Sequence, residues 1–261
     1  MSIKNVLVIV SAAEEDNACL RMAFAIAEQH QAKVVALYVK PVVAVYSDGM
    51  GFDMTPSIIE AQQTYLDSAA KKAEDATKAQ AAKAQCPIEW RCEEGDEQLV
   101  AASHAHYADL VLATPDTARD LMFVAGVPVI AVPAQTPPQS PKSILVAWNG
   151  SRESARAVRD AMDFLSAADQ VIVAVIDPPA GSQTGEDIAG LIASHGGKVD
   201  VREMLSGGQN IGSLLLREAK ANGVSMIVMG GYGHSRFREW VLGGVTDQIL
   251  SDAGLPVLLS H

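Results

Sequence analysis

An internal repeat constrains the fold of this chain more than any other feature. Residues 4–8 match residues 142–146, which lie 138 positions further on, and residues 34–38 match residues 172–176 in the same register. Both copies carry a stretch of helical spacing between the two matching runs. Two matches in one ungapped register indicate a duplicated unit. A chain of 261 residues is long enough for two domains of ordinary size.

The two copies differ in length at two places. Residues 109–112 match residues 225–228 only 116 positions further on, so the second copy has lost 22 residues before this run. Residues 125–129 match residues 253–257 at a distance of 128 positions, so the first copy lacks 12 residues between these two runs. The first copy therefore has an insertion around residues 57–85, and the second copy has a longer connection before its last strand.

Each copy alternates continuous apolar runs of four to seven residues with stretches of helical spacing. Such runs are typical of parallel strands that helices cover on both faces. We therefore expect an α/β fold of two tandem, doubly wound, five-stranded parallel-sheet domains. The first copy is expected to place strands near residues 3–10, 33–39, 88–92, 109–113 and 128–132. The second copy is expected to place them near residues 143–148, 170–176, 199–204, 225–229 and 256–260.

A proline-rich segment separates the copies. Residues 134–141 read Ala-Gln-Thr-Pro-Pro-Gln-Ser-Pro, and these prolines cannot continue a helix or a central strand. We place the boundary there, which gives domains of residues 1–138 and 139–261.

The insertion in the first copy is rich in alanine and predicts a long helix over residues 58–84, about 40 Å in length. Ser57 is its expected N-cap. The residues near helical spacing are Ile58, Ile59, Leu66, Ala69 and Ala73. We interpret it as a surface helix that covers the sheet or the partner domain, and a recruitment helix is the alternative.

Composition and charge limit the class of protein. Hydrophobic residues make up 49% and charged residues 20%, which excludes a disordered or fibrous chain. No apolar run reaches the roughly 18 residues that span a bilayer, and the N-terminus lacks a signal-peptide pattern, so we expect a cytoplasmic protein. The net charge of −11 disfavours nucleic acid and anionic membranes as partners. Residues 139–261 carry 13 acidic and 10 basic side chains, against 18 and 10 in residues 1–138, so the second copy tolerates an anionic ligand better.

The three cysteines, Cys19, Cys86 and Cys92, are an odd number without CxxC spacing. They predict packing residues rather than a disulfide framework or a zinc site.

A glycine-rich connection follows the fourth strand of the second copy. Residues 230–233 read Gly-Gly-Tyr-Gly, and nine residues later residues 243–246 read Gly-Gly-Val-Thr at the start of a helical stretch. In open parallel sheets, ligands lie beyond the carboxyl ends of the strands, and glycines let backbone N–H groups approach phosphate. The Walker A lysine is missing, and Arg236 stands where a dinucleotide-binding fingerprint requires glycine. Alternatively, the glycines only make a tight loop.

The spacing Gly-x2-Gly-x9-Gly-x-Val-Thr, followed by the Ala-Gly-Leu-Pro-Val-Leu run of residues 253–258, resembles the C-terminal signature of the universal stress protein family. Residues 144–151 are similar to that family's first strand and the turn after it. With the repeat, the resemblance spans the chain, as in tandem members. It implies Rossmann-like domains of the adenine-nucleotide alpha-hydrolase type and a stress-related regulatory role.

The resemblance also implies an ATP site, with Mg²⁺ accompanying the ATP, in the second copy. The acidic residue that meets the ribose is replaced by Asn149, whose amide can still form a hydrogen bond but carries no charge. A backbone group of Val175 would meet the adenine. Gly244 stands where the family usually has Ser or Thr, which removes one hydroxyl contact. The implied nucleotide-binding residues are Ala147, Trp148, Asn149, Val175, Met229, Gly230, Gly233, Gly243, Gly244, Val245 and Thr246. Arg236 and Arg238 could add charge near the phosphates, or could be solvated loop residues.

The first copy is expected to be degenerate. Its fourth strand ends in the Leu-Ala-Thr-Pro-Asp of residues 112–116, most of the glycine connection is missing, and Ser11 occupies the ribose-facing position. Family dimers form through the last strands, so the resemblance implies that the two copies pair with each other in this way. A homodimer is a further option.

Two other chemistries are disfavoured by their own spacing. Residues 233–237 imitate the start of a nucleophile elbow, with Asp247, Asp252 and His261 following in hydrolase order, but Phe237 replaces the second glycine. As the terminal residue, His261 is also a poor candidate for a positioned base. His104 and His106 could be metal ligands, yet their spacing points them to different faces of a helix.

We therefore expect a tandem universal stress protein that binds one adenine nucleotide and regulates rather than catalyses. No set of general-base or nucleophile residues surrounds the glycine connection, so any ATP hydrolysis should be slow. The alternative is an interaction module without a nucleotide, in which the glycine loop is structural. An unknown protein partner would then dock on the acidic first domain or on its long helix.

Overall fold

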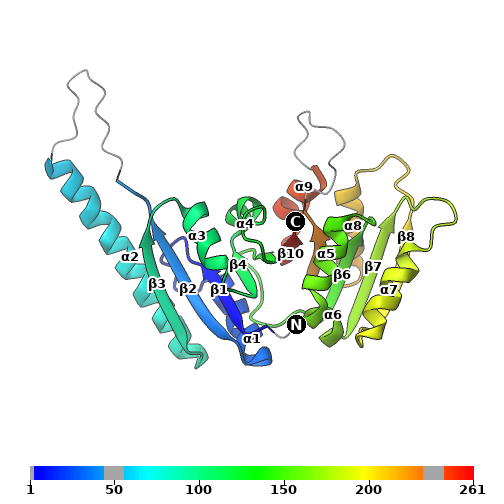
Figure 1. Cartoon of the computed structure of the whole chain (residues 1–261), viewed down its shortest axis with the longest axis horizontal. Helices are drawn as coiled ribbons and strands as arrows, with labels where there is room; N and C mark the ends of the chain where they lie inside the picture. Colours follow the sequence, from blue (N-terminus) through cyan, green and yellow to red (C-terminus); the bar gives the residue numbers. More distant parts are fainter. Residues whose placement is uncertain (1–2, 44–55, 232–243) are drawn as a thin grey trace, which may run out of the picture.

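The computed structural model describes residues 3–43, 56–231 and 244–261, and these residues form one ten-stranded sheet (Figure 1). Its strand order is β3-β2-β1-β4-β5-β10-β9-β6-β7-β8, so each copy contributes five neighbouring strands in the same relative order. The α/β, doubly wound fold is confirmed. The two sheets are, however, continuous with each other.

The elements of the first copy are β1 (Asn5–Ile9), α1 (Ala18–His30), β2 (Lys33–Lys40), α2 (Pro56–Ala84), β3 (Ile88–Glu94), α3 (Glu97–Ala105), β4 (Leu110–Ala113), α4 (Pro115–Leu121) and β5 (Val129–Ala131). Those of the second copy are β6 (Ser143–Trp148), α5 (Arg152–Asp160), α6 (Met162–Ala167), β7 (Gln170–Ile176), α7 (Thr184–Ser194), β8 (Val199–Met204), α8 (Ile211–Ala221), β9 (Met226–Gly230), α9 (Gly244–Asp252) and β10 (Val257–Ser260). Every predicted strand is present.

The last strands of the two copies join the halves. β5 and β10 pair in antiparallel orientation, with Ile130 opposite Leu258 at the centre, and both side chains are fully buried. Among the described strands, every other neighbouring pair is parallel. The expected pairing of the copies within one chain is therefore confirmed.

The core consists of two apolar layers, one on each face of the sheet. Alternate residues of a strand enter different layers: Ile144 and Val146 of β6 pack into one and Leu145 into the other. Helices α1, α2, α5, α6 and α7 cover the first layer. Helices α3, α4, α8 and α9 cover the second layer. Burial on both faces explains the continuous apolar runs of the sequence.

Helix α2 is the predicted insertion. It begins at Pro56, so Ser57 lies inside the first turn and the expectation that it caps the helix is wrong. Proline suits this position because its ring fixes φ at a helical value and it has no N–H to leave unpaired. Only the C-terminal part of α2 packs on the sheet, where the buried residues begin at Ala70.

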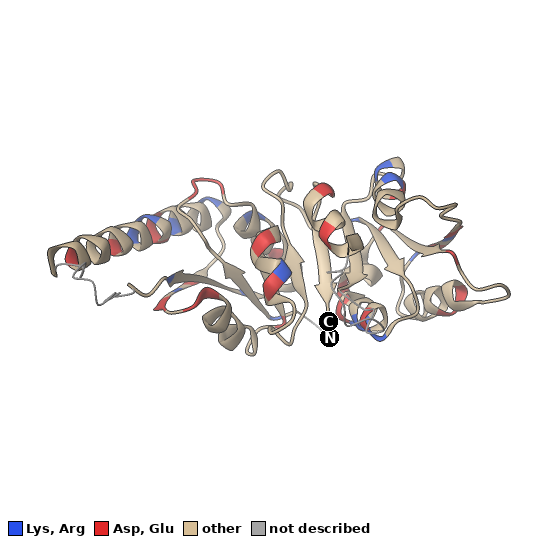
Figure 2. Ribbon diagram, turned by 90° about the horizontal axis from the view of Figure 1, so that it is seen from above, with Lys and Arg blue, Asp and Glu red and all other residues tan. Residues whose placement is uncertain are grey.

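The N-terminal part of α2 projects beyond the sheet (Figure 1). Ile58, one of the apolar residues near helical spacing, is 51% exposed. Acidic and basic side chains alternate along the helix (Figure 2). Lys71 pairs with Asp75 at 2.6 Å, and Glu74 pairs with Lys78. These pairs, four residues apart, support a solvated helix.

The segment between the copies is tied to the first copy. Two carbonyl oxygens, those of Ala134 and Thr136, accept hydrogen bonds from the Arg21 guanidinium of α1 at 2.9 and 3.0 Å. The domain boundary at residues 138 and 139 stays a prediction.

The cysteines behave differently from one another. Cys19 is buried in the core, and this burial raises the pKa of its thiol to about 12. Cys86 is half-buried against the same layer. Cys92 is exposed, so the prediction that Cys92 is a packing residue is wrong.

Among the described helices, none has the length and hydropathy needed to cross a membrane.

Candidate functional site

The carboxyl ends of β6 and β9 lie side by side in the second copy. Ala147 of β6 is the register partner of Met229 of β9. After β6 the chain continues into α5 on one face of the sheet, whereas α9, which follows β9, lies on the other. Such a switch point between neighbouring strands is where ligands bind in open α/β sheets. The fold therefore brings together five predicted site residues: Ala147, Trp148, Asn149, Met229 and Gly230.

A tight turn follows β6. The side-chain oxygen of Asn149 accepts a hydrogen bond from the backbone N–H of Ser151 at 3.0 Å, and Gly150 between them has a φ of +73°. Ser151 then caps α5, because its hydroxyl oxygen accepts from the N–H of Ser154 at 3.1 Å. Asn149 thus helps to shape the turn, and its exposed side chain retains an amide N–H₂ that could donate to a ligand.

Sequence reasoning missed a carboxylate close to this turn. Glu153, in the first turn of α5, is buried and pairs with Arg152 at 3.0 Å. Burial alone would raise the pKa of Glu153, but hydrogen bonds from its own backbone and from Arg152 outweigh burial and lower this pKa. A charged carboxylate therefore lies beneath the end of β9, although Asn149 carries no charge.

The glycines at the end of β9 have packing roles. A Cβ on Gly230 would lie 2.5 Å from the backbone of Glu153 and Ser154, so α5 can approach β9 only at a glycine. A Cβ on Gly231 would overlap the end of the Met122 side chain, which comes from the first copy. Gly230 is thus required for packing, whereas the flexible Met122 side chain could move away from a Cβ on Gly231.

The N-terminus of α9 is open by contrast. Gly244 is exposed, and a Cβ placed on it would meet no atom of the described residues within 4 Å. Val245 is half-buried, and Thr246 is only 4% exposed. Free backbone N–H groups and the helix dipole make such an end favourable for an anion. Gly233 and Gly243 lie outside the described residues, as do Arg236, Arg238 and the elbow residues 233–237.

Trp148 places a hydrogen-bond donor, its indole N–H, near the carboxyl end of β6. It is the last residue of β6, its ring packs against the first apolar layer, and its indole Nε1 is buried with no hydrogen-bond partner among the described residues. Val175, the predicted adenine contact, is its register partner in β7. A buried N–H without a partner costs roughly 1–3 kcal/mol, so an acceptor atom of a ligand would be favoured there.

At the corresponding point of the first copy, no loop separates the fourth strand from the next helix. Thr114 follows β4 directly and caps α4, whose first residue is Pro115. The predicted loss of the glycine connection is confirmed. Ser11, at the position that the resemblance predicts to face a ribose, is exposed.

The competing chemistries find little support. His104 is held between Arg91, at 3.0 Å from Nδ1, and Glu93, at 2.7 Å from Nε2. Within the described ranges, no group of three or more His, Cys, Asp or Glu side chains could hold a metal ion. His261 contacts the carbonyl oxygen of Gly231 at 3.1 Å, and Asp247 pairs with Arg119 at 3.1 Å, so neither is arranged as a triad member.

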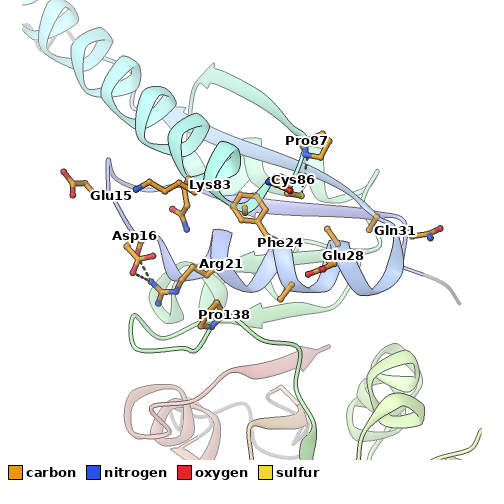
Figure 3. A pocket seen from close by; sticks show the side chains of 16 residues that line it. Glu15, Asp16, Arg21, Phe24, Glu28, Gln31, Lys83, Cys86, Pro87 and Pro138 are labelled. Atoms are coloured by element: carbon orange, nitrogen blue, oxygen red, sulfur yellow. Dashed lines mark hydrogen bonds and ion pairs between the residues drawn. The ribbon is translucent and has the colours of Figure 1, made fainter.

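A groove of about 760 Å³ lies elsewhere, between α1 and the C-terminal end of α2 (Figure 3). Its charged lining residues are Glu15, Asp16, Arg21, Glu28 and Lys83. Three carboxylates against two cations suit a polyphosphate poorly, and Asp16 already pairs with Arg21 at 2.5 Å. Asn17 and Gln80 likewise bond to each other, so the groove is not the predicted nucleotide site.

Comparisons with known proteins agree with this architecture. The model of the universal stress protein family matches residues 2–115 and 141–261. A universal stress protein structure from Archaeoglobus fulgidus DSM 4304 is 15% identical, covers 98% of this chain and 95% of its own, and has a TM-score of 0.70. A protein of unknown function from Pseudomonas aeruginosa PAO1 is 16% identical, covers 99% and 92%, and has a TM-score of 0.60. No curated protein matches the chain significantly.

Proposed function

The chain belongs to the universal stress protein family, and from that premise we propose that its second half, residues 139–261, binds an adenine nucleotide. The ligand is ATP, accompanied by Mg²⁺, at the carboxyl ends of β6 and β9. The phosphates meet the N-terminus of α9, and the base and ribose lie towards the ends of β6 and β7.

One observation carries the proposal, namely the contrast between the two copies at the same topological point. In the first copy α4 begins directly after β4, whereas in the second copy residues 231–243 separate β9 from an α9 whose first residue is open to solvent. A long connection that ends at an open helix N-terminus fits an anionic ligand. The unused N–H of Trp148 at the same edge gives further support.

The proposed role is regulatory binding. Asp247 and His261, two of the three residues that followed in hydrolase order, are engaged in contacts with the first half. We therefore propose a protein whose nucleotide occupancy, rather than turnover, matters in a stress response, with at most slow hydrolysis.

The test is titration calorimetry of the protein, stripped of carried-over ligand, with ATP, ADP and AMP in the presence of Mg²⁺. One nucleotide per chain is expected. Gly233→Arg should abolish this binding, because it replaces a glycine of the predicted phosphate-binding spacing by a large side chain. The matched control is Gly190→Arg on the exposed side of α7, where a Cβ would meet no atom within 4 Å, and it should bind like the wild type. No binding by the wild type at millimolar nucleotide contradicts the proposal.

A second candidate is an interaction module without a nucleotide. It is favoured by the packing role of Gly230, which explains this glycine without a ligand, and by the projecting N-terminal part of α2. Under this reading, Gly233→Arg leaves partner binding intact. The calorimetric experiment distinguishes the two functions, because only the first predicts that the wild-type protein binds a nucleotide.

A further inference from the structure

The groove between α1 and the C-terminal end of α2 has the form of a docking surface (Figure 3). Arg21, Phe24 and Glu28 follow one another at spacings of three and four residues, so they share one face of α1 and span about 10 Å of its axis. Figure 3 shows the Phe24 side chain pointing from this face into the groove. Lys83 and Ala84 line the groove from α2. The groove is therefore a space that runs between two helices.

The floor of the groove is apolar, and most of its side chains are small. The uncharged lining includes Phe24, Ala25, Ala27, Ala32, Ala84 and Cys86. The distance between packed helices depends on the side chains at their contact, so alanines let a further helix approach closely. The floor thus suits an apolar stripe on a third helix.

The matching place of the second half is closely packed. Cys86 lies two residues before β3, and Gly197 lies two residues before β8. A Cβ on Gly197 would lie 3.2 Å from the carbonyl oxygen of Leu165 in α6. The chain after α7 is therefore held against α6, whereas in the first half a groove of about 760 Å³ lies between α1 and the end of α2. The shared fold alone does not require this groove.

The charges at the rim determine which partner the groove fits. Arg21 pairs with Asp16 at 2.5 Å. The hydrogen bond from Arg21, followed by the charges of Arg21 and Lys83, holds the pKa of Asp16 below its ordinary value. Both cations thus act on one carboxylate. Glu15 and Glu28 are exposed and pair with no cation among the described residues.

The negative charge of Glu28 extends to the floor of the groove. Burial, and after it the charge of Glu28, raises the pKa of the Cys86 thiol, so this thiol stays neutral. An uncharged floor is therefore bordered by two unpaired carboxylates, in a half that carries 18 acidic and 10 basic side chains. Such a surface attracts a positively charged partner.

We propose that the groove between α1 and α2 binds a basic amphipathic helix of a partner protein. The apolar stripe of that helix packs on Phe24 and the alanines, and its lysine or arginine side chains pair with Glu15 and Glu28, as in other helix-in-groove complexes. The inference rests on the second candidate function, the interaction module, for which it names the surface and the class of partner. It does not depend on nucleotide binding.

The test uses a fluorescein-labelled model helix of about 18 residues, with leucines along one face and lysines on the other. A matched peptide has glutamate in place of lysine. Fluorescence anisotropy with the full chain measures both affinities. The lysine peptide should bind at least about tenfold more tightly than the glutamate peptide, and added salt should weaken its binding. A wild type that does not bind the lysine peptide overturns the inference.

Two variants test whether the peptide occupies the groove. Ala84→Trp fills the groove without changing the charge and should weaken binding of the lysine peptide about tenfold. The double variant Glu15→Gln/Glu28→Gln should weaken it about fivefold. Circular dichroism checks that both variants fold as the wild type does. An unchanged affinity in Ala84→Trp overturns the inference.

Matched controls separate the groove from the overall negative charge. Ala61→Trp adds the same ring at an exposed position of the same helix, and Glu60→Gln/Glu203→Gln removes two exposed carboxylates away from the groove. Both should bind the lysine peptide within about twofold of the wild type. Losses as large as those of the groove variants would show unspecific attraction and overturn the inference.

Sedimentation velocity and calorimetry distinguish the remaining outcomes. A wild-type dimer that Ala84→Trp dissociates would assign the groove to a second copy of the chain and overturn the inference. Titration of Ala84→Trp with ATP should give the wild-type result, because the groove lies in the other half. A failure of nucleotide binding would therefore leave the docking surface standing, and a failure of peptide binding would leave the nucleotide site standing.

Discussion

At the end of its fourth strand the first copy turns directly into a helix, whereas the second copy has a connection before its last helix. The residues at matching positions differ accordingly. Thr114, which caps α4, stands where the second copy has Gly230, and Val10, fully within the core, stands where it has Trp148. The β-sheet and the strands at the join are alike in both copies. The two copies have thus kept the strands that form the shared sheet. They differ in the residues at the carboxyl ends of these strands.

The join should be the most sensitive place in the molecule. Ile130→Asp would put a carboxylate opposite Leu258 in the middle of the sheet, where both positions are fully buried. We expect a loss of more than about 4 kcal/mol in the free energy of unfolding, or no folding at all, because no partner can pair with the charge. Denaturant unfolding followed by circular dichroism measures the loss.

The control for the join is Tyr65→Asp on α2, where the wild-type side chain is 72% exposed, and its effect should be within about 0.5 kcal/mol. A loss below about 1 kcal/mol for Ile130→Asp would show that the two copies do not depend on the shared strands. The comparison of the copies would then describe two independent domains.

The glycines of the second copy allow a sharper comparison. Gly230→Ala should lower the free energy of unfolding by about 1–3 kcal/mol, because the new Cβ would lie 2.5 Å from the backbone of α5. Gly244→Ala should leave it unchanged or slightly higher, because the site is open and alanine favours a helix. Thermal and denaturant unfolding of the pair measure the difference. Equal effects at the two positions are the outcome that contradicts separate roles for the two glycines.

The strands could be predicted because burial on both faces leaves an unbroken apolar run in the sequence. The run of residues 143–148, for example, coincides with β6. The start of α2 was missed by two residues, because the pattern favours Ser57 as a cap and does not reveal that Pro56 begins the helix. Helix ends depend on local geometry that several residue types can satisfy.

Much of the candidate site could not be predicted, because it depends on contacts between distant residues. Gly231 reads as part of a phosphate loop, yet Met122 of the other copy fills the space beside it. Arg119 and Asp247 are 128 positions apart, and neither is part of the glycine spacing. Glu153 reads as a solvated first-turn acid, and only the packing of α5 on β9 buries it.

Substitution of Trp148 tests whether the carboxyl end of β6 contributes to nucleotide binding in the second copy. Trp148→Phe removes the indole N–H and keeps an aromatic ring, so the free energy of unfolding should change by less than about 1.5 kcal/mol. The affinity for ATP should fall about fivefold, since the donor left unpaired by the protein no longer meets the ligand. Calorimetry of this variant is compared with that of Trp90→Phe, which alters a ring stacked on Tyr38 in the first copy. An ATP affinity equal to that of the wild type would leave the N–H without a function in binding.

The smallest expected effect is a gain of affinity at Gly244. Gly244→Ser restores the hydroxyl that the family usually has there, and no atom of the part of the chain that the structure describes lies within 4 Å of the new Cβ. A hydroxyl at the first residue of α9 can donate one more hydrogen bond to a phosphate oxygen, so the affinity for ATP should rise about threefold, whereas that for adenosine should not change. Gly244→Ala adds the Cβ without the hydroxyl and serves as the control. If alanine and serine gave the same affinity, the gain would come from the backbone, and the N-terminus of α9 would not contact phosphate through this side chain.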